Sequence, residues 1–247
     1  NKSSLLLLPL YTFLHTPYAL TTEYSGALSA SHLSASGSSA ESEAIAVLDL
    51  DVEGKVGSGR WHVYIEGTST SKSGHISDVY GESYADAGAA ADEDGDGRIQ
   101  ISNLEYYHPL ENGELVVGLL YPSGFTESGD WTNDETTQFI GSSFANIQTS
   151  ANPDYALGIG YTGALSNDVS INLLVSQAQG LGDLDGRYSS LVDEMDEYFI
   201  ASEVAWSLNH TSIHASLWAS TLDTERLNGS GTANNYGVNI TVAHTNP

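Results

Sequence analysis

The acidic run DEDGDGRI at residues 92–99 is the part of the chain whose spacing best fits ion binding. Asp92, Asp94 and Asp96 alternate with other residues, as in the first half of an EF-hand calcium loop. The position eleven residues after Asp92 holds Asn103 instead of the bidentate Glu, and the following residues alternate as in a strand. Two alternatives stay open, a looser Ca²⁺ site at the three aspartates or an acidic turn leading into a strand.

The sequence contains no arrangement of side chains typical of a hydrolase. Its eight His include no His-Glu-x-x-His pair, no Gly-x-Ser-x-Gly elbow is present, and the chain has no Cys. Paired carboxylates are frequent, but in a chain this acidic they carry little weight as a glycosidase signal. We therefore expect a protein that is not an enzyme.

The balance of charge excludes one large class of partner. The chain has 32 Asp and Glu against 7 Lys and Arg, a formal net charge of -25. Nucleic-acid binding requires a basic surface that displaces phosphate counterions, so no nucleic-acid partner is expected. Strongly acidic surfaces suit salty or calcium-rich surroundings, where their self-repulsion is screened, which favours an extracytoplasmic setting.

The first residues have the pattern of a secretory signal peptide. Lys2 precedes an apolar stretch over residues 5–14, and a small residue, Ala19, follows. We expect a signal peptide over residues 1–19 and one β domain over residues 20–247; the alternative is a buried N-terminal strand or helix. No later stretch reaches the ~20 apolar residues of a transmembrane helix, so a membrane-spanning form would have to be a barrel.

Alternation of apolar and polar residues recurs along the rest of the chain and predicts strands. The clearest case is residues 169–177, where Val169, Ile171, Leu173 and Val175 alternate with other residues. Similar alternation marks residues 44–53, 61–66, 212–217 and 236–244. From Tyr24 onward the pattern predicts about ten strands of the ~10-residue length that spans a membrane. One apolar and one polar face is the distribution expected with lipid outside and water inside.

The connections alternate between short and long. Short turns are expected at residues 54–59, 111–113, 165–168 and 209–210, and longer polar stretches at 70–97, 122–153, 178–196 and 222–234. Short turns on one side and long loops on the other are typical of an outer-membrane barrel. The long stretches hold most of the acidic residues.

Several polar side chains are then expected to face the lumen. They are Asp49, Asp51, Glu53, His62, Tyr64 and Glu66, and Glu105 is expected to join them. An acidic lumen favours cations or neutral, hydroxyl-rich solutes. Tyr and His rings are suited to stacking on sugars; the alternative is that these side chains only line water.

The middle of the chain resembles the carbohydrate-selective porin family. The stretch NLEYYHPLENGELVVGLLYP at residues 103–122 is similar to that family's strand, hairpin turn and strand. Residues 139–146, FIGSSFAN, and residues 153–161, PDYALGIGY, follow in the same order and spacing, over about 60 residues in all.

This resemblance implies an all-β, antiparallel transmembrane barrel of about sixteen strands. The chain would hold its N-terminal part and lack the C-terminal strands. The implied function is a passive outer-membrane channel of a Gram-negative bacterium for small hydrophilic solutes, sugars among them. Its implied surroundings are outer-membrane lipid and lipopolysaccharide, and because trimers are common among porins, the suggested assembly is a homotrimer.

A second interpretation is a secreted calcium-binding β-sandwich, an adhesin or lectin-like protein. It accounts for the acidic composition, the Asp-rich run and the strands. It does not account for the alternation of short turns and long loops.

Overall fold

The protein is described from a computed structural model, which covers residues 22–34, 42–69, 97–129, 151–182, 187–193, 195–225 and 229–245. The N-terminal segment expected to be a signal peptide and the calcium-loop candidates Asp92, Asp94 and Asp96 lie outside these residues.

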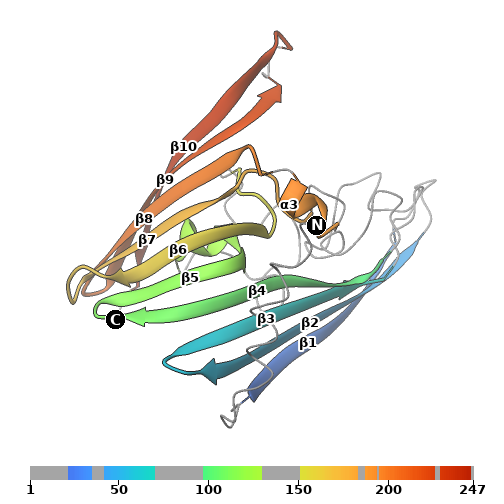
Figure 1. Ribbon diagram of the computed structural model, residues 1–247, viewed down its shortest axis with the longest axis horizontal. Helices are drawn as coiled ribbons and strands as arrows, with labels where there is room; N and C mark the ends of the chain where they lie inside the picture. The colour runs from blue at the N-terminus through green and yellow to red at the C-terminus, as the bar shows by residue number, and fades with distance from the viewer. Residues whose placement is uncertain are drawn as a thin grey trace, which may run out of the picture.

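Ten strands form one continuous sheet (Figure 1). The strands are β1 (Thr22–Leu33), β2 (Glu43–Val56), β3 (Gly59–Thr68), β4 (Ile99–Leu110), β5 (Gly113–Leu120), β6 (Ala156–Ala164), β7 (Val169–Gln177), β8 (Tyr198–Leu208), β9 (Thr211–Glu225) and β10 (Thr232–His244). Within the described ranges, two short helices accompany them, the 3-10 helix η2 (Pro122–Phe125) and α3 (Ser190–Asp193).

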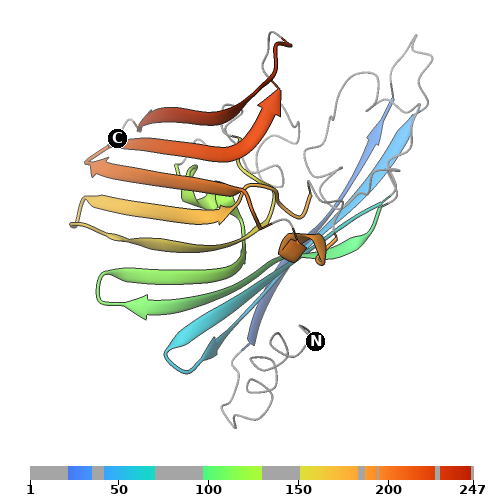
Figure 2. The same cartoon turned by 45° about the horizontal axis from the view of Figure 1, so that its top comes forward.

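Each strand pairs in antiparallel fashion with the next, so the spatial order is the sequence order. The prediction of an all-β antiparallel fold with about ten strands is confirmed. The described sheet curves but does not close, since β1 and β10 are its two edges (Figure 2). No helix in the described ranges is both long and apolar enough to cross a membrane.

The four predicted short turns join strands that pair as hairpins. The β2–β3 turn begins at Gly57, whose φ of 60° is the left-handed conformation that glycine adopts without steric cost. The β4–β5 turn is Glu111-Asn112, so it lies one residue before the Asn112-Gly113 pair that favours a tight hairpin, and Gly113 is already the first residue of β5. Asn209 starts the β8–β9 turn with φ 54°, which Asn tolerates better than most residues.

One predicted loop is shorter than expected. The polar stretch over residues 222–234 was assigned to a loop, but β9 continues to Glu225 and β10 begins at Thr232. The register of the two strands shifts between Asn234 and Asn235, and beyond this shift they stay paired as far as Thr232 opposite Glu225. Polarity alone therefore gave the wrong strand ends here.

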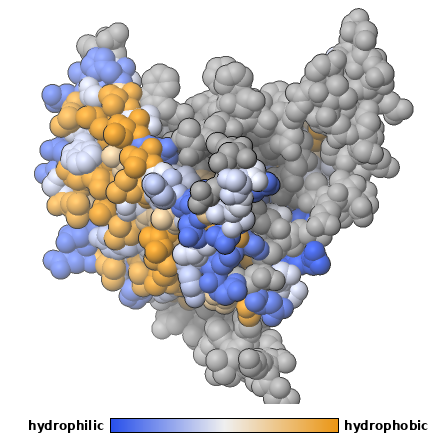
Figure 3. Space-filling view, turned by 90° about the horizontal axis from the view of Figure 1, so that it is seen from above, coloured by the Kyte–Doolittle hydropathy of each residue, from blue (hydrophilic) through white to orange (hydrophobic). Residues whose placement is uncertain are grey.

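The two faces of the sheet have an inverted distribution of polarity. Carboxylates on one face are buried: Glu66 and Glu203 are each 2% exposed. Apolar residues on the other face are exposed: Leu28 is 77% and Ile240 69% exposed. In the space-filling view, apolar residues gather over one side of the molecule (Figure 3). A water-soluble protein arranges its strands the opposite way, with the apolar face buried.

Candidate solute-lining site

A polar strip runs across the buried face of β2, β3 and β4. The antiparallel register places its members directly opposite one another, as Asp49 with Glu66, Asp51 with Tyr64, and His62 with Glu105. Glu53 lies opposite His62 on the side away from Glu105, so all seven residues that the sequence predicts as lumen-lining share one face of the sheet. Cross-strand neighbours on one face lie close enough for their side chains to interact.

His62 on β3 links a carboxylate of β2 to a carboxylate of β4. Its Nε2 lies 2.9 Å from Asp51 Oδ1, and its Nδ1 lies 3.0 Å from Glu105 Oε2. Glu105 also accepts hydrogen bonds from the Tyr107 hydroxyl, at 2.7 Å, and from Asn103 Nδ2, at 3.0 Å. Glu105 is only 5% exposed, so this set of donors replaces the water that a buried carboxylate loses.

Toward the C-terminal end of β3, the strip contains a second pair of carboxylates, Asp49 and Glu66. The Tyr64 hydroxyl donates to Asp49 Oδ1 at 2.7 Å, and the Ser102 hydroxyl donates to Glu66. A bulge in β4 places Ser102 as an extra residue between the partners of Tyr64 and Ile65. This bulge resets the alternation, which explains why the orientation of Glu105 is difficult to derive from sequence.

Near the start of β3, the guanidinium of Arg60 is the main positive charge of the strip. Arg60 Nη2 lies 3.0 Å from Glu114 Oε2, and the guanidinium carbon lies 3.4 Å from the centre of the Tyr107 ring. This geometry combines an ion pair with a cation–π contact. Arg60 thereby positions Tyr107, whose hydroxyl donates to Glu105. Hydrogen bonds and ion pairs therefore connect the strip from Asp51 to Glu114.

A polar hollow of about 280 Å³ opens beside this network. Carboxylates predominate among its charged groups, since it is lined by Glu23, Tyr24, Ser25, Asp51, Glu53 and His62. Carboxylates and a histidine in a water-filled hollow attract cations and accept hydrogen bonds from hydroxyl groups. No group of three or more His, Asp or Glu among the described residues is arranged to hold a metal ion.

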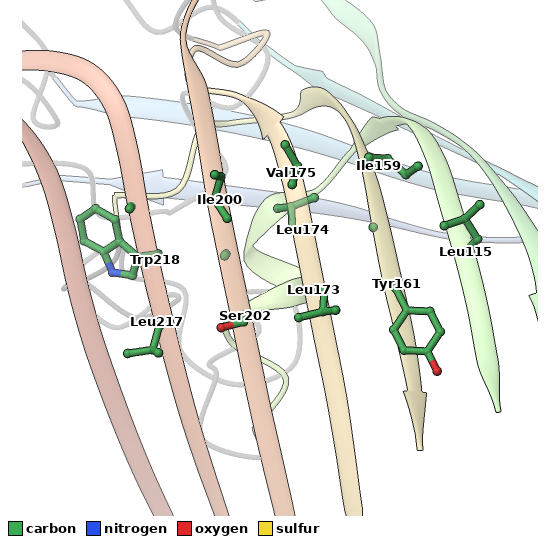
Figure 4. A pocket seen from close by; sticks show the side chains of 13 residues that line it. Leu115, Ile159, Tyr161, Leu173, Leu174, Val175, Ile200, Ser202, Leu217 and Trp218 are labelled. Carbon is green, nitrogen blue, oxygen red and sulfur yellow. The ribbon is translucent and has the colours of Figure 1, made fainter. Parts of the chain in front are cut away.

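A different hollow, of about 550 Å³, lies on the opposite face of the sheet (Figure 4). Its side chains are nearly all apolar, among them Ile159, Leu173, Val175, Ile200 and Leu217. It contains no charged group, so the polar strip and not this hollow is the candidate solute-lining site. Figure 4 shows η2 behind the strands, on the other side from these side chains.

The chain after β5 folds back over the buried face; residues 122–129 are called the inner segment. Its helix η2 contacts β6, β7 and β8. Phe125 belongs to a buried apolar cluster with Val116, Leu120, Leu174, Phe199, Ala201 and Trp218. The predicted external loop over residues 122–153 is therefore wrong for its first part, because these apolar contacts bring the chain inward.

Buried polar groups fix the inner segment at both ends. Near its start, Asn152 Nδ2 donates to Ser123 Oγ at 3.1 Å and to Glu127 Oε1 at 2.7 Å. At its end, Ser128 donates to Glu203 through its hydroxyl and through its backbone N–H, the latter at 3.3 Å. His214 Nδ1 lies 3.6 Å from the same Glu203 carboxylate. The inner segment thus reaches from β5 across the sheet to β8 and β9.

Sequence reasoning missed Glu203, Asn152 and the inner segment. The alternation of β8 places Glu203 opposite the apolar face, a signal that was available. Nothing in the local pattern of residues 122–129 distinguishes a segment that turns inward from one that turns to solvent.

Gly160 is where the inner segment approaches the sheet most closely. A Cβ at this position would lie 2.3 Å from Phe125 Cε1, far inside van der Waals contact. We expect Gly160→Ala to lower the free energy of unfolding by roughly 1–3 kcal/mol through overpacking. Denaturant unfolding measures the change. Gly124→Ala is the control, because its Cβ meets only Tyr121 at 3.9 Å; equal stability of the two variants would contradict this packing.

Comparison with known proteins gives no match: no family model fits the chain, and no curated protein is significantly similar to it.

Proposed function

We propose that this chain forms part of an outer-membrane β-barrel that acts as a passive channel for small hydrophilic solutes, sugars among them. The observation that carries the proposal is the inverted sheet, with buried carboxylates on one face and exposed Leu, Ile, Val and aromatic residues on the other. In a bilayer, this arrangement places water inside and lipid outside. A closed wall of about sixteen strands, the number that the family resemblance implies, requires further strands between β10 and β1.

The polar strip supports an acidic lumen. Asp49, Asp51, Glu66 and Glu105 outnumber the nearby Arg60, so cations and neutral, hydroxyl-rich solutes are favoured over anions. The inner segment lies on the same buried face, over β6, β7 and β8, and would narrow the proposed lumen on that side. Outer-membrane lipid and lipopolysaccharide are the proposed surroundings, and a homotrimer is the proposed assembly.

The alternative, a secreted calcium-binding β-sandwich, is less well supported. A sandwich packs two sheets face to face about 10 Å apart, with an apolar core between them. The described strands form a single sheet, and its buried face carries several carboxylates beside the apolar cluster around Phe125. The channel accounts for both features.

Heat-modifiable gel mobility of the full-length protein, extracted from outer membranes, tests the proposal. A compact unheated band that shifts on boiling is expected of a closed, detergent-resistant barrel. Vesicles containing the protein are expected to take up small sugars faster than protein-free vesicles. A soluble protein without the shift, whose melting temperature rises with Ca²⁺, would instead support the β-sandwich.

A further inference from the structure

Both ring nitrogens of His62 face a carboxylate. Nε2 lies 2.9 Å from Asp51 Oδ1 on β2, and Nδ1 lies 3.0 Å from Glu105 Oε2 on β4. An ionised carboxylate only accepts hydrogen bonds, and a neutral imidazole carries a hydrogen on one of its two nitrogens. Both contacts are therefore hydrogen bonds only when the ring is the doubly protonated imidazolium, with a positive charge between β2 and β4.

The surroundings of the two carboxyl groups fit this assignment. Glu105 accepts from the Tyr107 hydroxyl and from Asn103 Nδ2 as well as from His62. A carboxylate has about four lone-pair sites, so it accepts all three hydrogen bonds. The side chain of Asp51 is 44% exposed, so water reaches its carboxylate. The hydrogens of both contacts are therefore supplied by His62.

Most of the charge around His62 is negative, and water reaches the ring. His62 lies between Glu53 on β2 and Glu105 on β4, and it lines the hollow of about 280 Å³ together with Asp51, Glu53 and Glu23 of β1. Other ionisable side chains on this face nearby are Lys55 on β2, Arg60 and Tyr64 on β3, and Tyr107 on β4. Three carboxylates against one imidazolium give the lining of the hollow a net charge of -2.

Loss of one proton from His62 changes this arrangement in a defined way. A neutral ring donates one hydrogen bond, so one carboxylate loses its donor. The side chain of Glu105 is 5% exposed and that of Asp51 44%, and losing a donor costs more where water cannot replace it. The remaining hydrogen therefore stays on Nδ1 beside Glu105. Asp51 is released into the hollow, whose lining then has a net charge of -3.

We propose that His62 is a proton-controlled selectivity switch of the channel. As an imidazolium it binds Asp51 and weakens the preference for cations, and as a neutral ring it releases Asp51 and strengthens that preference. The inference rests on the proposed channel function and describes the regulation of its polar strip. Histidine is the side chain that ordinarily changes its charge between pH 5 and 8, so mild changes of pH operate such a switch.

Reversal potentials in planar bilayers containing the full-length protein test the switch. One charge about 10 Å from a permeating ion in water changes the permeabilities of cations and anions about two-fold each, in opposite directions. The cation-to-anion permeability ratio of the unmodified protein is therefore expected to rise about four-fold from about pH 5 to about pH 9 at low salt. His62→Gln donates hydrogen bonds without a charge, so it is expected to keep the high ratio and to lose this rise.

Two further variants make the result specific. His62→Lys keeps a positive charge over this range of pH and is expected to hold the ratio at its low value. His108→Gln is the matched control, the same substitution at an exposed histidine on the opposite face of β4, and it is expected to behave like the unmodified protein. Other carboxylates of the strip titrate in every variant, so their contribution cancels in the comparison with His62→Gln.

The protonation of the ring gives a measurement that does not depend on conductance. Nitrogen-15 chemical shifts of histidine-labelled protein distinguish protonated from non-protonated ring nitrogens, and the His62 signals are those absent from His62→Gln. Both nitrogens are expected to be protonated at about pH 6, and Nε2 alone is expected to have lost its proton at about pH 9. A ring that is neutral at the lower pH or cationic at the higher one overturns the switch. Loss of the proton from Nδ1 instead overturns the release of Asp51.

The outcomes separate the switch from the channel itself. Absence of conductance from the unmodified protein at every pH means that the channel function is wrong, and the switch with it. Conductance with the same pH dependence in the unmodified protein and in His62→Gln means that the channel stands and the switch is wrong. An effect of His108→Gln as large as that of His62→Gln also overturns the switch, because the pH dependence then does not come from the polar strip.

Discussion

Replacing Glu203 with alanine is expected to release the end of the inner segment and to raise the single-channel conductance. The buried carboxylate accepts two hydrogen bonds from Ser128, and hydrogen bonds to a charged group contribute roughly 1.5–3 kcal/mol each. Every ~1.4 kcal/mol changes an equilibrium about ten-fold, so loss of both bonds shifts the segment well toward a detached state. Conductance in planar bilayers and the size limit for sugar uptake measure the change.

Two control variants make the result specific. Glu203→Gln keeps an acceptor oxygen for Ser128 and is expected to have a smaller effect than alanine. Ser202→Ala, next along β8 on the opposite face, is expected to leave conductance unchanged. Unchanged or reduced conductance in Glu203→Ala would show that the inner segment does not limit the channel.

The strands could be predicted because their signal is local. Alternation and short turns identified the hairpins, and a register fixed by the turn at Glu111-Asn112 places Tyr107 opposite Val116. The polar strip followed from the same alternation, since one register step separates the two faces of the sheet along each strand. These features depend on neighbours a few residues apart.

The inner segment and the hydrogen bonds between Tyr188 and Ile101 could not be predicted because their signals are long-range. Ser128 meets Glu203 across 75 residues of sequence, and Tyr188 meets Ile101 across 87. In both cases the residues around one partner carry no sign of the other. The bulge at Ser102 illustrates the same limit within a strand, because one extra residue reverses the face of everything that follows.

Neutralising the middle of the polar strip is expected to reduce the preference for cations. The double variant Asp51→Asn, Glu105→Gln keeps the size of both side chains and removes two negative charges beside His62. A carboxylate about 10 Å from a permeating ion in water contributes about 0.4 kcal/mol. Removing two lowers the permeability to cations about four-fold and raises that to anions by a similar factor, so the cation-to-anion permeability ratio falls roughly sixteen-fold. Reversal potentials under a salt gradient measure this ratio.

The matched control is Glu111→Gln, which removes a charge from the exposed β4–β5 turn. Its effect is expected to be much smaller, because an exposed charge at the rim is screened by salt before an ion enters. The effect of the double variant is expected to shrink as salt rises toward 1 M, where the Debye length falls to about 3 Å. Equal selectivity of the double variant and the unmodified protein at low salt would remove Asp51 and Glu105 from the ion path. The hollow beside His62 would then be a structural feature of the sheet, and charge selection would have to occur elsewhere in the proposed channel.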